Sequence, residues 1–210
     1  MTSGYDAILF DFDGVLVDSE PIHWACWREV VAPYGLALTW EDYARECIGV
    51  SDRKMIEALC RIAGRDSLFD PVWAEYPRKK ALFRDRMLLA VPMPTATREL
   101  LLQMAGPPLA VVSSSGRLEV EPALEAAGVR AAFATIVTGD DVRRLKPDPE
   151  PYLIAAARLG ARRPLVVEDS DAGARAGSAA GFDVLRIADP ERTAESVLAR
   201  LGPSSWTPAG

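Results

Sequence analysis

The chain has 210 residues, is 49% hydrophobic and carries a formal net charge of -6 from 24 basic and 30 acidic side chains. This composition supports a sizeable buried core. It argues against a nucleic-acid or anionic-membrane binder, because both need a basic face. The N-terminus lacks a secretory leader, and no apolar run is long enough to span a bilayer, so we expect a cytoplasmic protein.

Five short apolar runs predict the strands of one sheet. Helical patterns separate the later runs and end at glycines, which commonly terminate helices. Strands that alternate with helices in this way indicate βαβ units, and therefore an α/β fold with a doubly wound parallel sheet. The predicted strands cover residues 7–10, 109–112, 135–137, 165–167 and 184–187, and the helices cover 119–127, 151–159 and 172–180.

The long interval between the first two strands has a different character. It carries apolar residues at three- and four-residue spacing, with no strand-like alternation. We therefore predict a helical domain over residues 18–90, inserted into a core made of residues 1–17 and 91–210. The predicted helices of the insert cover 22–31, 40–47, 52–63 and 71–88, and basic residues 78–80 are interpreted as a solvated helix face.

Cysteines occur at Cys26, Cys47 and Cys60. Their number is odd and their spacing is wide, with no paired metal-ligand motif. We expect reduced, mostly buried thiols instead of disulfides or a zinc site.

Polar side chains follow the predicted strands at the points where ligands bind in open α/β sheets. Two carboxylates that end a buried strand are costly unless a cation offsets their charge, and carboxylate oxygens suit magnesium. The groups are residues 11–14 (Asp-Phe-Asp-Gly), 113–115 (Ser-Ser-Ser), 146–149 (Lys-Pro-Asp-Pro) and 168–173 (Glu-Asp-Ser-Asp-Ala-Gly).

This set of side chains suits phosphoryl transfer. Asp11 can attack phosphorus as the nucleophile, and Asp13 can protonate the leaving oxygen and then deprotonate water. Lys146 and the hydroxyl of Ser113 can hold the phosphoryl oxygens, with Ser114 as a further candidate. Backbone N–H groups near Gly14 can add donors.

Asp169, with Glu168 beside it, would complete a magnesium site that includes Asp11 and Asp13. Plainer readings exist for each group. The aspartates could cap a turn, a serine of the triplet could cap a helix, and Lys146 could be a solvated lysine before a turn. The occurrence of all four groups in strand order favours the chemical interpretation.

The four groups together resemble the haloacid dehalogenase superfamily, whose members are mostly phosphatases and phosphomutases. The resemblance implies a strand order of 5-4-1-2-3, Asp11 as nucleophile and Asp13 as acid and base. It also implies magnesium held by Asp11, Asp169 and the carbonyl of Asp13. The helical insert resembles the cap of the subgroup that includes β-phosphoglucomutase and phosphoglycolate phosphatase, a cap that opens and closes over the site.

Two departures from the mutase pattern favour a phosphatase. The segment 49–53 (Gly-Val-Ser-Asp-Arg) has Asp52 where the mutases have a phosphate-gripping arginine. Arg53 comes one place later, which rotates its side chain by about 100° on a helix. Gly116 stands where the mutases have a lysine. Arg53 stays a candidate substrate ligand, and His23 matches a hinge histidine of the subgroup.

We therefore predict a magnesium-dependent phosphatase that hydrolyses a small phosphomonoester, such as a sugar phosphate, through an aspartyl-phosphate. The expected partner is a small phosphorylated metabolite, not nucleic acid or membrane, and the expected state is a monomer. A β-phosphoglucomutase-like phosphomutase is one alternative. A non-enzymatic protein that keeps a phosphate-binding cleft for regulation is another.

Overall fold

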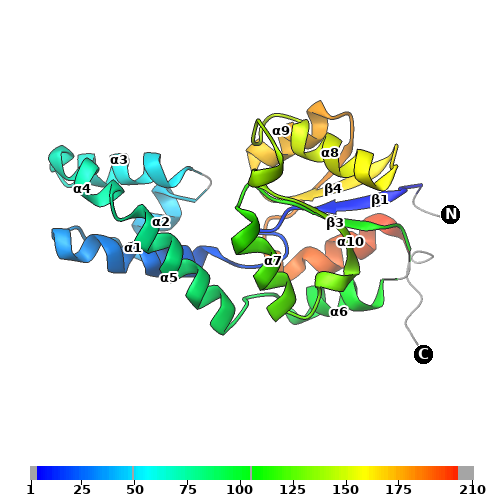
Figure 1. Cartoon of the computed structure of the whole chain (residues 1–210), viewed down its shortest axis with the longest axis horizontal. Helices are drawn as coiled ribbons and strands as arrows, with labels where there is room; N and C mark the ends of the chain where they lie inside the picture. Colours follow the sequence, from blue (N-terminus) through cyan, green and yellow to red (C-terminus); the bar gives the residue numbers. More distant parts are fainter. Residues whose placement is uncertain (1–3, 49, 105, 203–210) are drawn as a thin grey trace. The chain divides into compact units, whose positions relative to one another are not determined.

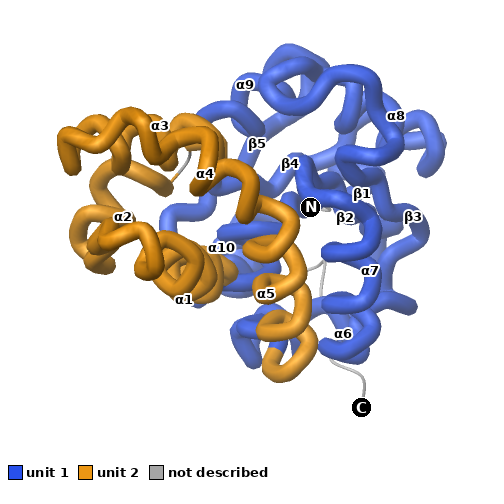
Figure 2. Tube along the Cα trace, turned by 60° about the vertical axis from the view of Figure 1, so that its left-hand side comes forward, with its two compact units in different colours: residues 1–18, 91–210 blue, residues 19–90 orange. Residues whose placement is uncertain are grey.

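The computed structural model describes residues 4–48, 50–104 and 106–202. The chain forms two compact units, which Figure 2 shows in different colours. The core unit contains residues 1–18 and 91–210, and the helical unit contains residues 19–90.

The core unit contains a five-stranded sheet in which all neighbouring strands run parallel. The strand order is β3-β2-β1-β4-β5, which is 5-4-1-2-3 when read from the other edge. The predicted doubly wound parallel sheet is therefore confirmed. The strands are β1 (Ala7–Phe10), β2 (Leu109–Val112), β3 (Phe133–Val137), β4 (Pro164–Glu168) and β5 (Asp183–Arg186).

Five helices cover the two faces of this sheet. In Figure 1, α8 and α9 lie on one face, and α6, α7 and α10 lie on the other. Both faces of β1, β2 and β4 are consequently buried, which explains why their sequences are apolar runs, interrupted only by Glu168 at the end of β4. The helices are α6 (Thr95–Gln103), α7 (Arg117–Ala126), α8 (Glu150–Leu159), α9 (Asp171–Ala179) and α10 (Thr193–Leu201).

The sequence analysis did not identify α6 and α10. Each lacks a side-chain hydrogen bond at its N-cap, and each buries a threonine, Thr97 or Thr193, among its apolar residues. A polar residue on the buried face weakens the apolar periodicity from which helices are predicted.

The register of the sheet aligns the ends of its central strands. Phe10 pairs with Val111 on one side and with Val167 on the other. The chain therefore leaves β1, β2 and β4 at the same edge, and this edge receives Asp11, Ser113 and Glu168.

The helical unit contains α1 (Glu20–Val31), α2 (Trp40–Glu46), α3 (Asp52–Ile62), α4 (Phe69–Trp73) and α5 (Tyr76–Leu89). The single helix predicted over 71–88 is wrong, because α4 ends at Trp73 and α5 starts at Tyr76. Pro77 lies in the first turn of α5. In a continuous helix its ring would clash with the carbonyl of Trp73.

The interpretation of residues 78–80 as a solvated face is wrong for Lys79, whose side chain is only 2% exposed. Its Nζ lies 2.7 Å from Nδ1 of His23 and 3.3 Å from a carboxylate oxygen of Asp52. Asp52 also accepts a 2.6 Å hydrogen bond from Nε1 of Trp27. A lysine can occupy this core because Asp52 supplies the opposite charge.

Cys26, Cys47 and Cys60 are free and buried, as predicted. Among the described residues, no helix is long and apolar enough to cross a membrane.

Replacing Asp52 with alanine should destabilise the helical unit, because the Lys79 ammonium would stay buried without its carboxylate. We expect a loss of about 2–3 kcal/mol, below the value for a fully buried pair because Asp52 is partly exposed. Lys79→Met removes the charge and keeps the apolar stem, so its cost should be about 1 kcal/mol, as for a typical point substitution. Urea unfolding can be followed by tryptophan fluorescence, since Trp24, Trp27, Trp40 and Trp73 lie in this unit.

The matched control is Asp85→Ala, which removes an exposed carboxylate from α5. Its effect should stay within about 0.5 kcal/mol. An Asp52→Ala protein as stable as this control would contradict the proposed role of the ion pair.

Candidate active site

Asp11 is fixed at the carboxyl end of β1. Its backbone N–H donates to the carbonyl of Val167 at 2.9 Å, which extends the β1–β4 ladder by one residue. The chain then turns back, with the N–H of Gly14 donating to the carbonyl of Val17 at 2.8 Å. Phe12 is buried, as expected for a residue that points away from the neighbouring aspartates.

Lys146 joins the ends of three strands. Its Nζ donates to Oδ1 of Asp11 at 2.6 Å, to the carbonyl of Val112 at 2.8 Å and to Oε1 of Glu168 at 2.7 Å. The side chain is 5% exposed, and the Lys146–Pro147 peptide bond is cis. The three contacts match the three N–H donors of an ammonium group. Lys146 is thus a buried member of the site, and the reading as a solvated lysine is wrong.

Glu168 is fully buried and surrounded by donors. Besides Lys146, it accepts hydrogen bonds from the hydroxyl of Tyr152 at 2.9 Å and from the N–H and hydroxyl of Ser170 at 2.9 and 3.0 Å. A Cβ at Gly173 would lie 1.6 Å from Oε1 of Glu168. Only glycine therefore leaves space for this carboxylate. The sequence analysis assigned no role to Tyr152, Ser170 or Gly173.

Asp169 completes a cluster of acids. Carboxylate oxygens of Asp11, Glu168 and Asp169 all lie within 4.8 Å of one another. Gly14 lies against this cluster in the left-handed conformation, with φ of 74°, and a Cβ there would be 2.3 Å from Oδ2 of Asp169. Gly14 is therefore required sterically by the acid cluster, beyond the backbone donor role predicted from sequence.

The electrostatics of the cluster are strongly unbalanced. Burial raises the pKa of Asp11 well above its usual value, and the charges of Glu168 and Asp169 act in the same direction against Lys146. Burial and the charge of Glu168 raise the pKa of Asp169 to about 7. Burial opposes ionisation of Glu168, but the Lys146 charge and the hydrogen bonds from Lys146, Ser170 and Tyr152 together outweigh it and lower the pKa of Glu168. Burial likewise opposes the charge of Lys146, but the surrounding acidic groups, Asp11 first among them, together outweigh it and raise the pKa of Lys146.

One ammonium facing three carboxylates leaves a deficit of positive charge, which the raised pKa values of two acids reflect. A hard divalent cation such as Mg²⁺ would remove this deficit, because its preferred ligands are carboxylate oxygens. The residues present at this edge of the sheet therefore fit a magnesium site.

The three serines after β2 differ in their contacts. Ser113 is buried, its N–H donates to the carbonyl of Val137 at 2.9 Å, and its hydroxyl oxygen accepts from the N–H of Ser115 at 3.0 Å. Ser114 is exposed. The hydroxyl of Ser115 donates to Oδ2 of Asp13 at 2.8 Å. Ser115 is thus the serine in contact with the second aspartate. The sequence analysis named Ser113 and Ser114 as phosphate ligands and assigned no catalytic or binding role to Ser115.

Two predicted substrate ligands belong to the helical unit. His23 stacks on Phe83 with ring centroids 3.9 Å apart and contacts Lys79. Arg53 lies 3.4 Å from a carboxylate oxygen of Glu57, with its guanidinium 4.8 Å from the centre of the Phe69 ring. Gly49, the first residue of the 49–53 segment, lies outside the described residues.

A comparison with protein families adds to this geometry. The family of haloacid dehalogenase-like hydrolases matches residues 8–187. The chain belongs to this family. As a haloacid dehalogenase-like hydrolase, it has the Asp11, Ser113, Lys146 and Asp169 groups in the order that the sequence resemblance implied.

Two characterised relatives are similar to this chain along most of their length. The chain is 33% identical to the phosphorylated carbohydrates phosphatase of Thermotoga maritima over 183 residues, covering 85% of this chain and 82% of that protein. It is 31% identical to the fructose-1-phosphate phosphatase YqaB of Escherichia coli, covering 89% and 98%. The crystal structure of a predicted phosphoglycolate phosphatase from Haemophilus somnus has the same fold, with a TM-score of 0.78 at 24% identity over 90% of this chain and 87% of that one.

Gly173→Ala should damage the site and the fold together. The new Cβ would overlap Glu168, so the buried carboxylate would have to leave Lys146 and Tyr152. We expect a loss of about 3 kcal/mol in the free energy of unfolding, as for other broken buried charge pairs. Thermal or urea unfolding measures the loss. The matched control is Gly116→Ala, because a Cβ there meets nothing closer than 3.5 Å. Equal stability of the two variants would show that Gly173 does not make room for Glu168.

Proposed function

We propose that this protein is a magnesium-dependent phosphatase that hydrolyses a small phosphomonoester, most simply a sugar phosphate, through an aspartyl-phosphate on Asp11. The chain is a phosphoric monoester hydrolase of the haloacid dehalogenase type; the substrate class, the cation and the residue roles are our proposal. The observation that supports this proposal most directly is the buried contact of the Lys146 ammonium with the carboxylates of Asp11 and Glu168, beside Asp169. The two relatives named above are phosphatases of phosphorylated carbohydrates and of fructose 1-phosphate, which supports the substrate class.

In the first proposed step, a carboxylate oxygen of Asp11 forms a bond to phosphorus and the bond from phosphorus to the leaving oxygen breaks. Asp13 gives its proton to that leaving oxygen, so the alcohol departs neutral. Lys146 and the Ser113 hydroxyl, with Ser114 and the backbone near Gly14, bind the non-bridging oxygens. The ammonium of Lys146 is already fixed beside Asp11, and it would exchange one of its three present contacts to bind a phosphoryl oxygen.

In the second proposed step, Asp13 accepts a proton from water, and the water oxygen forms a bond to phosphorus. The bond between phosphorus and the Asp11 oxygen breaks, which releases inorganic phosphate and restores both carboxyl groups. Asp13 therefore returns to its protonated form and Asp11 to its ionised form, and the cycle balances.

Asp11, Glu168, Asp169 and the carbonyl of Asp13 would hold the magnesium ion. When bound, it would neutralise negative charge on the acids and on the phosphoryl oxygens. We assign the catalytic core to residues 1–17 and 91–210 and the cap to residues 18–90, with His23 and Arg53 as the proposed cap contributions to substrate binding.

The surroundings of Asp52 and Gly116, the two residues that depart from the mutase pattern, favour hydrolysis over mutase chemistry. Asp52 is engaged by Trp27 and Lys79 inside the helical unit. Next to Gly116 lies Asp140, whose carboxylate would be 3.5 Å from a Cβ at this position. An acid in place of a cation disfavours a second phosphate group.

Asp11→Asn should abolish turnover while the fold persists, because an amide cannot form the covalent intermediate. We expect phosphate release to fall by about 10⁴-fold or more, as for other nucleophile removals. The measurement is a phosphate-release screen over sugar phosphates, nucleotides and phosphoglycolate, with and without magnesium, on a mass-verified variant. Asp183→Asn, a change at the surface partner of Tyr5, is the matched control and should retain activity.

The same screen separates the alternatives. Isomerisation of a sugar phosphate that requires a bisphosphate primer, with little phosphate released, would identify a mutase. Absence of turnover on every phosphate, with magnesium binding intact, would identify a non-enzymatic phosphate-binding protein.

Magnesium should stabilise the protein more as the pH rises. The pKa of Asp169 is raised to about 7, above that of an unfolded carboxyl. The metal-free folded state therefore holds an extra proton from about pH 4 to 7, and its stability falls as pH rises through that window. Magnesium replaces this proton, so the increase in Tm should be larger near pH 8 than near pH 5.5. Asp169→Asn should reduce both the increase and its pH dependence. An increase that is equal at both pH values in the unmodified protein would contradict this account.

A further inference from the structure

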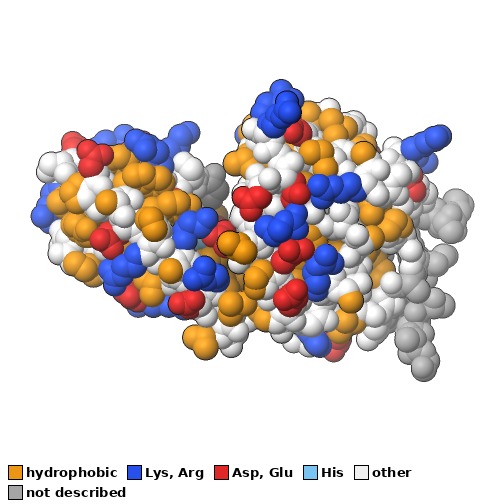
Figure 3. Space-filling model, in the orientation of Figure 1, with side chains coloured by type: hydrophobic (Ala, Val, Ile, Leu, Met, Phe, Trp, Pro, Cys, Tyr) orange, Lys and Arg blue, Asp and Glu red, His pale blue; other side chains and the backbone are white. Residues whose placement is uncertain are grey.

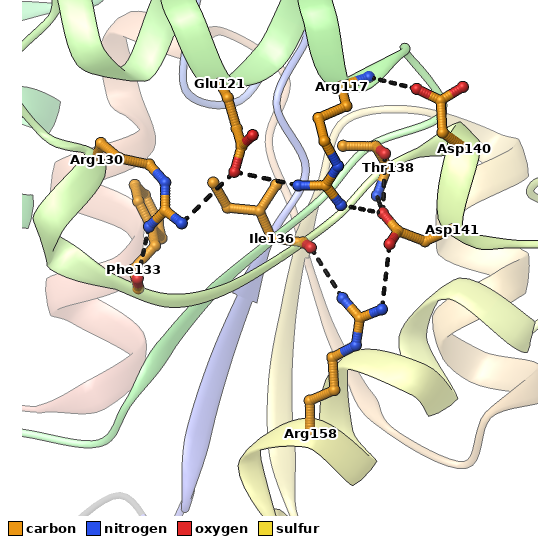
Figure 4. Close-up of polar contacts among 9 residues, drawn as sticks. All are labelled: Arg117, Glu121, Arg130, Phe133, Ile136, Thr138, Asp140, Asp141 and Arg158. Carbon is orange, nitrogen blue, oxygen red and sulfur yellow. Dashed lines mark hydrogen bonds and ion pairs between the residues drawn. The ribbon is translucent and has the colours of Figure 1, made fainter.

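The core unit contains a network of ion pairs at the end of β3, drawn in Figure 4. The guanidinium of Arg117 contacts Asp141 at 2.6 Å and Glu121 at 3.1 Å, and that of Arg158 contacts Asp141 at 3.1 Å and the carbonyl of Ile136 at 3.0 Å. In Figure 3, basic and acidic side chains are correspondingly interspersed over the part of this unit that contains α7 and β3. We call Arg117, Asp141, Arg158 and the turn at residues 138–141 the brace.

Asp141 is the centre of the brace. Its Oδ2 accepts from the N–H and the hydroxyl of Thr138 at 2.8 and 2.9 Å, in addition to Arg117. Burial opposes ionisation of Asp141, but the donors from Thr138 and Arg158 and the Arg117 charge outweigh it and lower the pKa. A carboxylate saturated in this way holds the turn and the start of α7 in one arrangement.

The brace is attached directly to the serine loop. The N–H of Gly139 donates to the carbonyl of Ser115 at 2.9 Å, and the N–H of Arg117 donates to Asp140 at 2.8 Å. A Cβ at Gly139 would lie 2.6 Å from the carbonyl oxygen of Ser114, so the turn and the loop are in backbone contact. The position of the loop at residues 113–116 is therefore set by the brace as well as by β2.

Ser115 is the point at which this loop meets the proposed proton donor, through the 2.8 Å hydrogen bond from its hydroxyl to Oδ2 of Asp13. A carboxylate can rotate about its side-chain bonds, and misplacement by about 1 Å can cost a catalytic group up to 100-fold in rate. A donor that engages Oδ2 fixes the plane of the carboxyl group.

We propose that Ser115 is a positioning residue for Asp13, and that Arg117 and Asp141 act through the loop to keep its hydroxyl in place. This inference rests on the proposed function, in which Asp13 protonates the leaving oxygen. The positioning role of Ser115 differs from phosphate binding, which we assign to Ser113, Ser114 and Lys146.

The leaving group provides the test. An alkoxide from a sugar phosphate is strongly basic and needs a proton as it departs, whereas 4-nitrophenolate is weakly basic and departs without one. A residue that orients the proton donor should therefore matter for the first substrate and much less for the second. The appropriate quantity is kcat/KM, because it covers the steps up to departure of the leaving group.

Ser115→Ala should lower kcat/KM about tenfold for the sugar phosphate hydrolysed fastest in the screen, and at most about twofold for 4-nitrophenyl phosphate. Ser115→Thr keeps the hydroxyl and should restore most of the loss. Asp141→Asn and Arg117→Gln should give the same dependence on the leaving group with a smaller loss. Arg130→Gln is the matched control, because the contacts of Arg130 are with Glu121 and the carbonyl of Phe133 and not with the loop. It should leave the ratio of the two kcat/KM values, sugar phosphate to 4-nitrophenyl phosphate, unchanged.

If Ser115→Ala lowered kcat/KM by the same factor for both substrates, the inference would be overturned, because loss of a structural or phosphate-binding role lowers kcat/KM for both. Failure of Ser115→Thr to restore activity would do the same. Asp13→Asn is the reference: it should show the same dependence with a larger loss. The proposed function itself fails if Asp13→Asn lowers kcat/KM equally for both substrates, or if the unmodified protein releases no phosphate. The inference then fails with it.

Discussion

The structure depends on the Lys146 ammonium, which is buried where three parallel strands end. It contacts Asp11 after β1, the carbonyl of Val112 at the end of β2 and Glu168 at the end of β4. A buried charge of this kind is stable only with complete partners. The junction therefore fixes the relative positions of the strand ends, and it also places a cation beside the proposed nucleophile. One contact set serves the fold and the chemistry.

The carboxylates around Lys146 carry more negative charge than its ammonium neutralises. Three carboxylates face one ammonium, and burial keeps the pKa of Asp11 and Asp169 above their usual values. Such an arrangement is unfavourable for a metal-free fold and favourable for binding a dication. Gly14 and Gly173 show that the backbone is shaped for this arrangement, because a side chain at either position would collide with Asp169 or Glu168. The metal-free fold is therefore destabilised at the acid cluster, where a bound cation and a phosphate would supply the missing interaction partners.

The sheet could be predicted from sequence because its central strands are buried on both faces, so each is an apolar run, interrupted only by Glu168 at the end of β4. The groups that follow the strands could be predicted for the same reason, since parallel strands deliver their ends to one edge. Partners that come together only through tertiary packing were not predictable. Tyr152 lies on α8 and looks like any core aromatic, Ser115 is one of three serines, and the counter-charge that lets Lys79 be buried lies on another helix. The strand order itself came from the family resemblance, not from residue patterns.

The most direct test of the central claim is a crystal structure of the protein with magnesium and beryllium fluoride, a mimic of the phosphoryl group bound to a carboxylate. The account predicts beryllium bonded to a carboxylate oxygen of Asp11, fluorides within hydrogen-bond distance of Lys146 and Ser113, and magnesium ligated by Asp11 and Asp169. Beryllium fluoride bound to another side chain, or a cluster of Asp11, Glu168 and Asp169 that takes up no cation from magnesium-containing crystals, would contradict it.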